Sequence, residues 1–283
     1  TGKPEGLSVV IPARDEFETI GVVLAATVST MKQMDIDYEI IVIDDGSIDQ
    51  SSAIASSRYC HLLKNSTNRG RGYSRNLGIK SSISDLVLFC DSSNVIPPDF
   101  TETAIRHFKD PLVSAVFGRI RNDKRLKDRF SRWRGRHLFR EHLPHRTDVH
   151  KVNCLITYAV VLRKNAVEEV GNFDTKLAQC EDIDLGKKLT ERGFKILSDP
   201  ALCAYSIRRE TMGSLCVRFN RWFSNDTDVS FRLLPTFWHT LRSCYKIYVL
   251  DDLRARDFGS MFISLLLPFW LAAIGLFAPN KLN

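Results

Sequence analysis

Acidic side chains follow two apolar runs of the sequence, at positions where carboxylates could do chemistry. Asp44 and Asp45 come directly after Tyr38–Ile43, and Asp91 comes directly after Asp85–Cys90. A carboxylate can accept hydrogen bonds from the imide N–H of a uracil or from ribose hydroxyls. A carboxylate beside a diphosphate can also share a divalent cation with it. Each motif taken alone also fits an ordinary turn or a capped loop.

Arginines and glycines are concentrated between these two runs, where they open a predicted helix. The segment Asn68–Gly78 contains three of each, including Arg71 and Arg75. Guanidinium groups and the N-terminus of a helix both suit a diphosphate. The glycines do not follow a strand at dinucleotide spacing, which excludes a Rossmann fingerprint.

A second pair of acids lies further along the chain, where another helix is predicted to begin. Glu181 and Asp182 follow Gly171–Asp174. A carboxylate there could act as a general base and take the proton of an attacking hydroxyl. Acids in a first helical turn are also routine partners of the helix dipole, and spacing alone favours that simpler interpretation.

The first hundred residues predict the elements that would position these groups. Leu7–Ile11, Tyr38–Ile43 and Asp85–Cys90 are compact apolar runs typical of buried strands, and helices are expected over Thr19–Met31 and Gly72–Ser82. This alternation predicts an α/β protein with a doubly wound, parallel sheet, in which ligands bind at the carboxyl ends of the strands.

The second half of the chain has a less regular pattern. We expect a strand or buried segment over Val152–Leu162, a short helix over Arg163–Val170, a helix from about Glu181 to Arg192 and an edge strand over Phe194–Leu197. Beyond about Thr211 the sequence turns helical, aromatic and basic.

Five segments taken together resemble the family 2 glycosyltransferases. In chain order they are SVVIPARDE, EIIVIDDGSIDQS, NRGRGYSRNLGI, LVLFCDSSN and GNFDTKLAQCEDIDLGKKLTERGFKI, and the resemblance covers about Leu7 to Ala204. It implies the GT-A fold, a Rossmann-like, nucleotide-binding mixed sheet flanked by helices. It also implies transfer of a sugar from a nucleotide-sugar donor with inversion at the anomeric carbon.

The resemblance implies roles for residues at matching positions. The first loop of the family, P-x-x-N-E-like, has Asp15 where asparagine is commoner, and its D-D-G-S element contacts nucleobase and ribose. The implied donor-binding residues are Pro12, Arg14 and Glu16 in the first loop, Asp44, Asp45 and Gly46 in the second, and Arg71 and Arg75 beside the donor.

The resemblance also implies a metal ion and a catalytic base. Asp91 matches the first acid of the D-x-D metal motif, but the second acid is replaced by Ser93, a position that the resemblance places beside the donor. A Mg²⁺ or Mn²⁺ ion held mainly by Asp91 and the donor diphosphate stays feasible. Asp182 matches the acid that acts as base, and Glu181 is its partner in the E-D pair.

Two features downstream suggest a membrane. Arg218, Arg221 and Trp222 form an R-x-x-R-W string that is similar to the Q-x-x-R-W element of processive synthases, in which Trp lies near the acceptor and Arg near the diphosphate. Gly259–Ala278 lacks charges and is about long enough to span a bilayer. A buried or amphipathic helix on the globular body is the alternative.

The distribution of charge and the spacing of the cysteines limit the binding partners and the cellular compartment that we expect for the protein. The net charge of +7 is concentrated in Arg119–Lys151, which has twelve Lys and Arg against four Asp and Glu. Such a block could meet phosphates of nucleic acid, of lipid headgroups or of a lipid-linked substrate, or be a solvated face. It lacks regular aromatic stacking, so no nucleic-acid partner is expected. Seven scattered cysteines without a C-x-x-C pair predict reduced thiols in a cytosolic setting.

These patterns predict three regions: a GT-A domain over 1–210, a helical, basic and aromatic juxtamembrane region over 211–258, and a membrane-associated or transmembrane segment over 259–283. The expected function is transfer from a UDP-sugar to a saccharide or lipid-linked acceptor at the cytoplasmic face of a membrane. A non-catalytic, GT-A-like module that binds the donor or the acceptor, suggested by the missing second acid, and a basic nucleic-acid-binding protein are the alternatives.

Overall fold

A computed structural model describes residues 6–56, 59–223, 241–242 and 244–277, with the side chains of 219–223, 244 and 271–277 outside the description. The chain forms two compact units, each discontinuous in sequence. The first contains residues 1–121 and 144–208, and the second contains residues 122–143 and 209–283. The units are described separately below.

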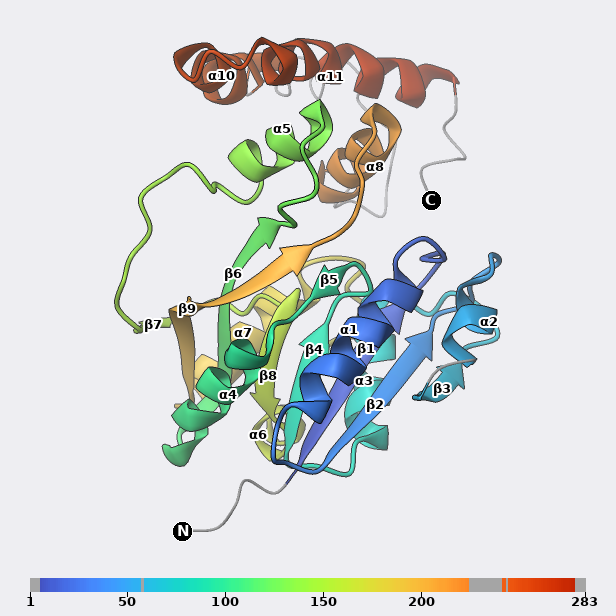
Figure 1. The fold of residues 1–283 in the computed structure, drawn as a ribbon, viewed down its shortest axis with the longest axis vertical. Helices are drawn as coiled ribbons and strands as arrows, with labels where there is room; N and C mark the ends of the chain where they lie inside the picture. The colour runs from blue at the N-terminus through green and yellow to red at the C-terminus, as the bar shows by residue number, and fades with distance from the viewer. Residues whose placement is uncertain (1–5, 57–58, 224–240, 243, 278–283) are drawn as a thin grey trace. The chain divides into compact units, whose positions relative to one another are not determined.

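The first unit is built on one mixed β-sheet with the order β3-β2-β1-β4-β8-β6-β9-β5, and β7 pairs with β9 (Figure 1). Strands β1 to β4 are parallel, whereas β8 pairs antiparallel with both β4 and β6. The strands are β1 (Leu7–Ala13), β2 (Tyr38–Asp44), β3 (His61–Lys64), β4 (Leu86–Cys90), β5 (Asn94–Val95), β6 (Val113–Asn122), β7 (His150–Val152), β8 (Ala159–Arg163) and β9 (Lys195–Ser206).

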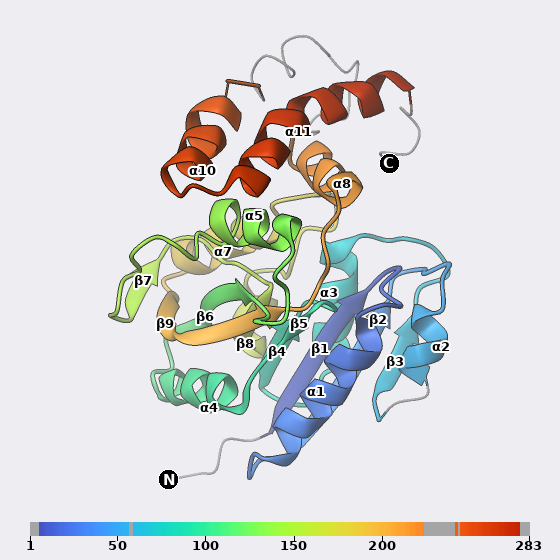
Figure 2. The ribbon, with the colours of Figure 1, turned by 45° about the horizontal axis from the view of Figure 1, so that its top comes forward.

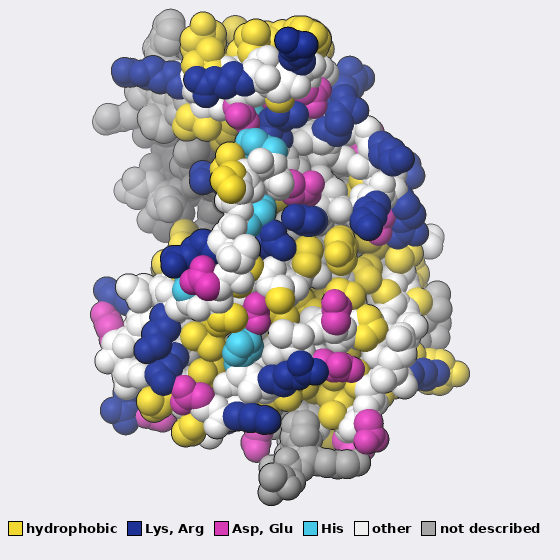
Figure 3. Space-filling view, turned by 60° about the vertical axis from the view of Figure 1, so that its left-hand side comes forward, with side chains coloured by type: hydrophobic (Ala, Val, Ile, Leu, Met, Phe, Trp, Pro, Cys, Tyr) yellow, Lys and Arg dark blue, Asp and Glu magenta, His cyan; other side chains and the backbone are white. Residues whose placement is uncertain are grey.

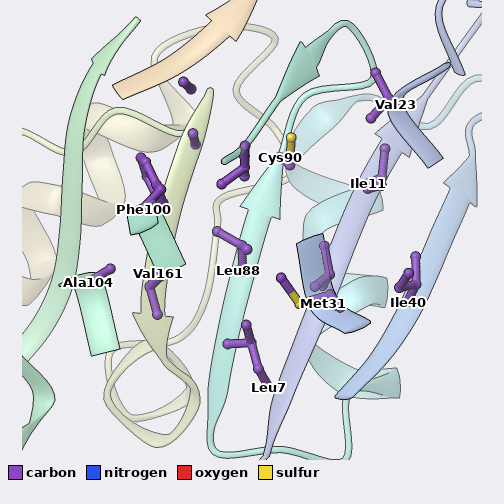
Figure 4. Close-up of a cluster of buried hydrophobic side chains, with 14 of the residues drawn as sticks. Leu7, Ile11, Val23, Met31, Ile40, Leu88, Cys90, Phe100, Ala104 and Val161 are labelled. Atoms are coloured by element: carbon purple, nitrogen blue, oxygen red, sulfur yellow. The ribbon is translucent and has the colours of Figure 1, made fainter. Parts of the chain in front are cut away.

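Helices cover both faces of this sheet (Figure 2). On one face α1 and α4 enclose a core with Leu7, Val9 and Ile11 (Figure 4), and on the other α3, α6 and α7 pack over Val10. Successive residues of β1 therefore enter opposite cores, as the pleat of a strand requires. The helical segments are α1 (Ile20–Lys32), α2 (Ser51–Ser56), α3 (Arg71–Ser81), α4 (Pro98–Arg106), η1 (His107–Lys109), α6 (Lys164–Glu169) and α7 (Glu181–Glu191).

Two sequence-based boundaries differ from the structure. Val152–Leu162 is not one strand: β7 ends at Val152 and β8 begins at Ala159. Between them the carbonyl of Tyr158 accepts hydrogen bonds from the Asp91 backbone N–H and the Asn94 side chain. Both donors lie in the segment that follows β4, so this carbonyl does not continue the hydrogen bonding between strands. The predicted edge strand Phe194–Leu197 is the start of the twelve-residue β9, which pairs with β5 and β7.

The second unit is a helical cluster. It contains α5 (Arg129–His137), α8 (Met212–Phe223), η2 (Cys244–Val249), α10 (Leu250–Arg254) and α11 (Phe258–Phe277). Its core contains Trp133, Leu215, Cys216, Ile263 and Leu267. No helix in the part of the chain described by the structure is long and apolar enough to cross a membrane. Ala278, the last residue of the predicted span, lies outside the described residues.

Part of the basic block is neutralised inside this second unit. Arg134 is fully buried and pairs with the buried Glu210. Arg136 pairs with Asp252 and Arg132 with Asp257. Some of the cations in the basic block therefore form ion pairs within the protein, because acids from residues 209–283 balance their charge.

Candidate functional site

The acids predicted to act together lie at one edge of the first unit's sheet. Asp44 ends β2, and Asp91 directly follows β4. Both strands are parallel neighbours of β1, so their carboxyl ends meet at the same edge. The backbone N–H of Asp45 donates to the carbonyl of Ala13, the last residue of β1. The carboxyl ends of β1, β2 and β4 thus form the edge at which the sequence predicts the site.

The adjacent carboxylates of Asp44 and Asp45 have different tasks. Asp45 accepts hydrogen bonds from the side chain of Asn65 at 2.7 Å and from the backbone N–H groups of Arg69 at 2.8 Å and Gly70 at 2.9 Å. Asp44 accepts one from the backbone N–H of Ser47 at 3.0 Å. Asp45 therefore clamps the loop that leads into α3, and Asp44 retains more capacity for a ligand.

Gly46 is required by the geometry of this turn. Its φ of +74° lies in the left-handed region, and an added Cβ would lie 2.7 Å from the carbonyl carbon of Thr67. A side chain here would push the loop of Thr67 away from β2. Gly46 thus shapes the site without offering it a functional group.

The first loop is held mainly by contacts within the protein. Glu16 forms an ion pair with Arg208 and accepts a hydrogen bond from the hydroxyl of Thr19. Arg14 is exposed and lies 3.7 Å from the carboxylate of Asp15, while Pro12 belongs to β1. Of the three predicted donor contacts in this loop, Arg14 has the side chain most open to a ligand.

Arg75 connects the donor edge with the acids of α7. Its buried guanidinium donates to Glu181, and its Nη2 lies 3.8 Å from a carboxylate oxygen of Asp91. The guanidinium carbon lies 5.6 Å from the ring centre of Phe173. Arg75 is thus an internal tie between acids, whereas Arg71, exposed in the first turn of α3, is open to a diphosphate.

A reciprocal amide contact fixes the same two segments. The Asn76 side chain donates to the carbonyl of Phe173 at 2.8 Å and accepts from the Phe173 backbone N–H at 3.0 Å. An added Cβ on Gly72 would lie 3.0 Å from the Asp174 carbonyl oxygen. Helix α3 and the loop that precedes Glu181 are therefore closely attached, although about one hundred residues separate them.

Asp182 has the environment expected of a base. Burial raises the pKa of its carboxyl, the negative charge of Glu181 raises this pKa further, and Arg75 opposes both effects. The hydroxyl of Thr157 donates to its Oδ2 at 3.4 Å, and the backbone N–H of Ile183 donates to its Oδ1 at 2.9 Å. The ionised carboxylate of Asp182 is thus a stronger base than that of an ordinary aspartate, because burial disfavours its charged form.

Sequence reasoning missed three residues that hold this arrangement: Thr157, Phe173 and the side chain of Asn76. Asn76 was visible in the R-N dipeptide, and Phe173 in the segment before the E-D pair. Thr157 is a polar residue in an apolar run, and it is almost completely buried. That burial cannot be seen without the fold.

The metal position offers one open carboxylate. The Asp91 side chain is 45% exposed. Ser93, in the place of the second acid, is nearly buried, and its carbonyl accepts from the Ile207 backbone N–H. Within the described ranges no three His, Cys, Asp or Glu residues gather in a group that could hold a metal ion. The exposed Asp91 carboxylate could share a cation with a ligand that brings further oxygens.

The R-x-x-R-W string belongs to the second unit. Arg218 lies on α8 and donates to Glu210, which also pairs with Arg134. Arg221 and Trp222 are within α8, but their side chains lie outside the described part of the chain. The predicted donor roles of these three residues stay predictions.

Comparison with known sequences identifies the family. The profile described as "Glycosyl transferase family 2" matches residues 8–171, more than half of the chain. The chain belongs to this family. The matched region includes Asp44, Arg75 and Asp91. Glu181 and Asp182 follow it, so their assignment depends on the geometry above and on the E-D motif.

Curated relatives of this glycosyl transferase family 2 member include a bacterial synthase and a bacterial glycosyltransferase. The chain is 28% identical over 254 residues to "Poly-beta-1,6-N-acetyl-D-glucosamine synthase" of Staphylococcus aureus, covering 87% of this chain and 60% of the synthase. It is 28% identical over 215 residues to "Pre-mycofactocin glycosyltransferase" of Mycobacterium tuberculosis, covering 72% and 43%. The chain thus spans only part of the length of these relatives.

Solved structures share the fold of this family member. Residues 1–349 of S. aureus TarS match with a TM-score of 0.55 and 16% identity, covering 92% of this chain and 90% of TarS. A Pyrobaculum calidifontis mannosyltransferase in complex with GDP-Man and Mn²⁺ matches with a TM-score of 0.53 and 14% identity, covering 98% and 76%. At these identities the likeness shows the fold alone, which is the GT-A fold that the sequence predicted.

Proposed function

We propose that this protein transfers a sugar from a UDP-linked donor to a hydroxyl of a saccharide or lipid-linked acceptor, with inversion at the anomeric carbon. The observation that supports this most is the position of Arg75, which holds Asp91 and Glu181 on its two sides. The donor edge and the base-bearing helix therefore form one site. The polysaccharide synthase among the relatives, and a TarS structure in complex with UDP-GlcNAc, agree with a UDP-sugar donor.

The donor would lie along the carboxyl ends of β1, β2 and β4. Asp44 has an oxygen to accept from the nucleobase or ribose, and the exposed guanidinium of Arg71 is available to the diphosphate. Asp91 would share a Mg²⁺ or Mn²⁺ ion with the diphosphate, and such an ion would offset the charge of the departing UDP. Because Ser93 supplies no carboxylate, Asp91 would be the acid of this motif that holds the ion.

Asp182 would perform the proton transfer. Its carboxylate removes the proton of the acceptor hydroxyl while that oxygen forms a bond to the anomeric carbon. The bond between this carbon and the diphosphate oxygen breaks, and UDP leaves with the electron pair. Attack from the face opposite the diphosphate inverts the configuration. Burial, which raises the pKa of Asp182, makes its carboxylate a stronger base for this step.

The decisive variant is Asp182→Asn. It should reduce transfer by about 10²–10⁴-fold or more while leaving UDP-sugar binding, measured as a thermal shift, unchanged. Asp184→Asn is the matched control, because Asp184 lies on the same helix and pairs with Lys188. Near-normal transfer by Asp182→Asn would reject the assignment.

The pH dependence of the parent protein gives a second test of the base. Asp182 accepts a proton only when it is deprotonated, and burial raises its pKa. As the pH is lowered, kcat/KM should therefore begin to fall at a higher pH than it would with an ordinary aspartate as the base.

The non-catalytic alternative is tested by release of UDP. A panel of UDP-sugars is incubated with and without Mn²⁺ and with candidate saccharide acceptors. A transferase releases UDP in a metal-dependent way, whereas a module that only binds sugar releases none under any condition. An Asp91→Asn variant should lose the metal dependence together with most of the release.

The location would be the cytoplasmic face of a membrane, with residues 211–258 beside the bilayer and 259–283 associated with it. Arg218, Arg221 and Trp222 would then serve the acceptor or the diphosphate at that surface. The uncharged, apolar segment from Gly259 to Ala278 and the R-x-x-R-W string before it support this placement.

A further inference from the structure

Helix α11 has its polarity reversed relative to a helix that faces water. Its side chains buried within the second unit include Ser260 and Ser264, beside Ile263 and Leu267. Its outward side carries a stripe of large apolar side chains, between 42% and 65% exposed: Phe258, Phe262, Leu265 and Phe269, with Trp270 next to it. Their spacing of four, three and four residues places the first four on one side of the helix.

The serines on the buried side of α11 form hydrogen bonds within the second unit, and these bonds account for a polar residue on that side. Ser264 donates to Asp252 at 2.7 Å and accepts from the indole N–H of Trp133 at 2.8 Å. Ser260 donates to Asp257 at 3.0 Å. The orientation of α11 is thus specified by buried hydrogen bonds, and the exposure of its phenylalanines follows from it.

The segments that precede α11 also expose large apolar side chains. Leu250 and Leu253 are exposed, as are Tyr245 and Ile247 of η2. We call these four residues and the α11 stripe the apolar face. In Figure 3 hydrophobic side chains gather at the top of the view, with Lys and Arg beside them. Clusters of exposed apolar side chains of this size mark interaction surfaces.

The charges around the apolar face are sorted by sign. The acids of this region turn inward: Asp251 and Asp252 pair with histidines of residues 137–142, and Asp257 pairs with Arg132. The cations Lys246, Arg254 and Arg256 are exposed, and no carboxylate of the described residues lies within 4.0 Å of them. The rim of the face is therefore positive.

From this arrangement we infer that the apolar face rests on an anionic lipid surface, with α11 lying along the interface. The helix inserts one side only, because Ser260, Ile263, Ser264 and Leu267 on its other side are packed within the unit. Phenylalanine and tryptophan enter the acyl boundary while the cations meet anionic headgroups. A second copy of the chain fits less well, because a symmetric contact would bring like-charged rims together.

This inference deepens the membrane location in the proposed function, and its test is independent of catalysis. The 283-residue protein is sedimented with vesicles of phosphatidylcholine alone and with vesicles that also contain phosphatidylglycerol. We expect binding to the anionic vesicles that weakens as salt increases. Phe262→Ser with Phe269→Ser should weaken it by roughly tenfold or more, and Arg254→Gln with Arg256→Gln by roughly fivefold for each arginine.

The control variant is Val22→Ser with Ile48→Ser, which removes two exposed apolar side chains of the first unit and should bind vesicles like the parent. Binding by the phenylalanine variant equal to that of the parent would overturn the inference, as would no preference for anionic vesicles. A dimer in solution that the same variant dissociates would assign the face to a second copy instead. UDP-sugar thermal shifts on these samples separate the outcomes, since the face variants should retain donor binding even where vesicle binding is lost.

Discussion

The tie between Arg75 and Glu181 makes a quantitative prediction about stability. Both side chains are almost completely buried, at 6% and 4% exposed. Arg75→Met keeps most of the length of the side chain but removes its charge and all of its donors. Glu181 would then be a buried carboxylate without its cation, while Asp91 would lose the nearby positive charge.

Breaking a buried ion pair by removing one partner costs about 3–5 kcal/mol. A domain of ordinary stability has about 5–15 kcal/mol in total, so the variant should lose a large part of it. Replacing both partners with apolar residues leaves no unpaired charge. The double variant Arg75→Met, Glu181→Met should therefore be more stable than Arg75→Met alone.

The measurement is urea unfolding of the parent, both single variants and the double variant. Arg192→Met is the control, because Arg192 forms an exposed pair with Glu169 in the same unit and should cost no more than about 1 kcal/mol. The reasoning fails if Arg75→Met is as mild as the control. It also fails if the two substitutions at 75 and 181 are additive within about 0.5 kcal/mol, the margin expected of independent sites.

Two further predictions concern the second loop of the site. Gly46→Ala should destabilise the protein by at least about 1–2 kcal/mol, the cost of the left-handed conformation, and by more than Gly193→Ala, since Gly193 also has positive φ but nothing within 4 Å of its added Cβ; thermal unfolding of both variants measures this difference. Asp44→Asn should weaken UDP binding with little effect on melting temperature, whereas Asp45→Asn should lower the melting temperature because Asp45 accepts three hydrogen bonds from the loop. Calorimetric titration measures the affinity for UDP, and thermal unfolding measures the melting temperature. Equal changes of both quantities in the two variants would contradict this division of tasks.

The sequence predicted the donor half of the fold well because its signals are local. Strands β1, β2 and β4 are short apolar runs, and α1 and α3 have clear helical spacing, so their boundaries differ from the structure by only a few residues. The mixed sheet was expected through the family resemblance. Periodicity alone had suggested a parallel sheet, because the antiparallel direction of β8 is not encoded in its own residues.

Elements with weak local signals were missed. The second half of strand β6 contains Arg119 and Arg121, and these charges interrupt the apolar pattern by which a strand beside β9 could be recognised. At Gly118 an added Cβ would lie 2.1 Å from the Leu202 carbonyl oxygen, so that glycine reflects a close approach rather than a turn. The grouping of residues 122–143 with the C-terminal helices is likewise tertiary, since it depends on pairs such as Arg134 with Glu210.

The sequence predicted which residue types make up the candidate site, but not which of their side chains are open to a ligand and which are held by contacts within the protein. Asp44, Asp45, Arg75 and Glu181 all match motifs, yet two of these carboxylates and the arginine are largely occupied by partners in the protein. A motif records which residue types occur together. Which of them faces a ligand depends on burial and on hydrogen bonds formed with distant segments.

The reciprocal contact between Asn76 and Phe173 has a kinetic consequence. Only a side chain with both an amide donor and an acceptor at this length can serve the carbonyl and the N–H of one residue, and aspartate and leucine, which resemble asparagine in size, cannot. Helix α3 and the loop before Glu181 are thereby joined in the absence of a ligand. In the proposed mechanism the base would therefore be in place before the substrates bind, and a slow closing step in turnover would have to arise in some other segment of the chain.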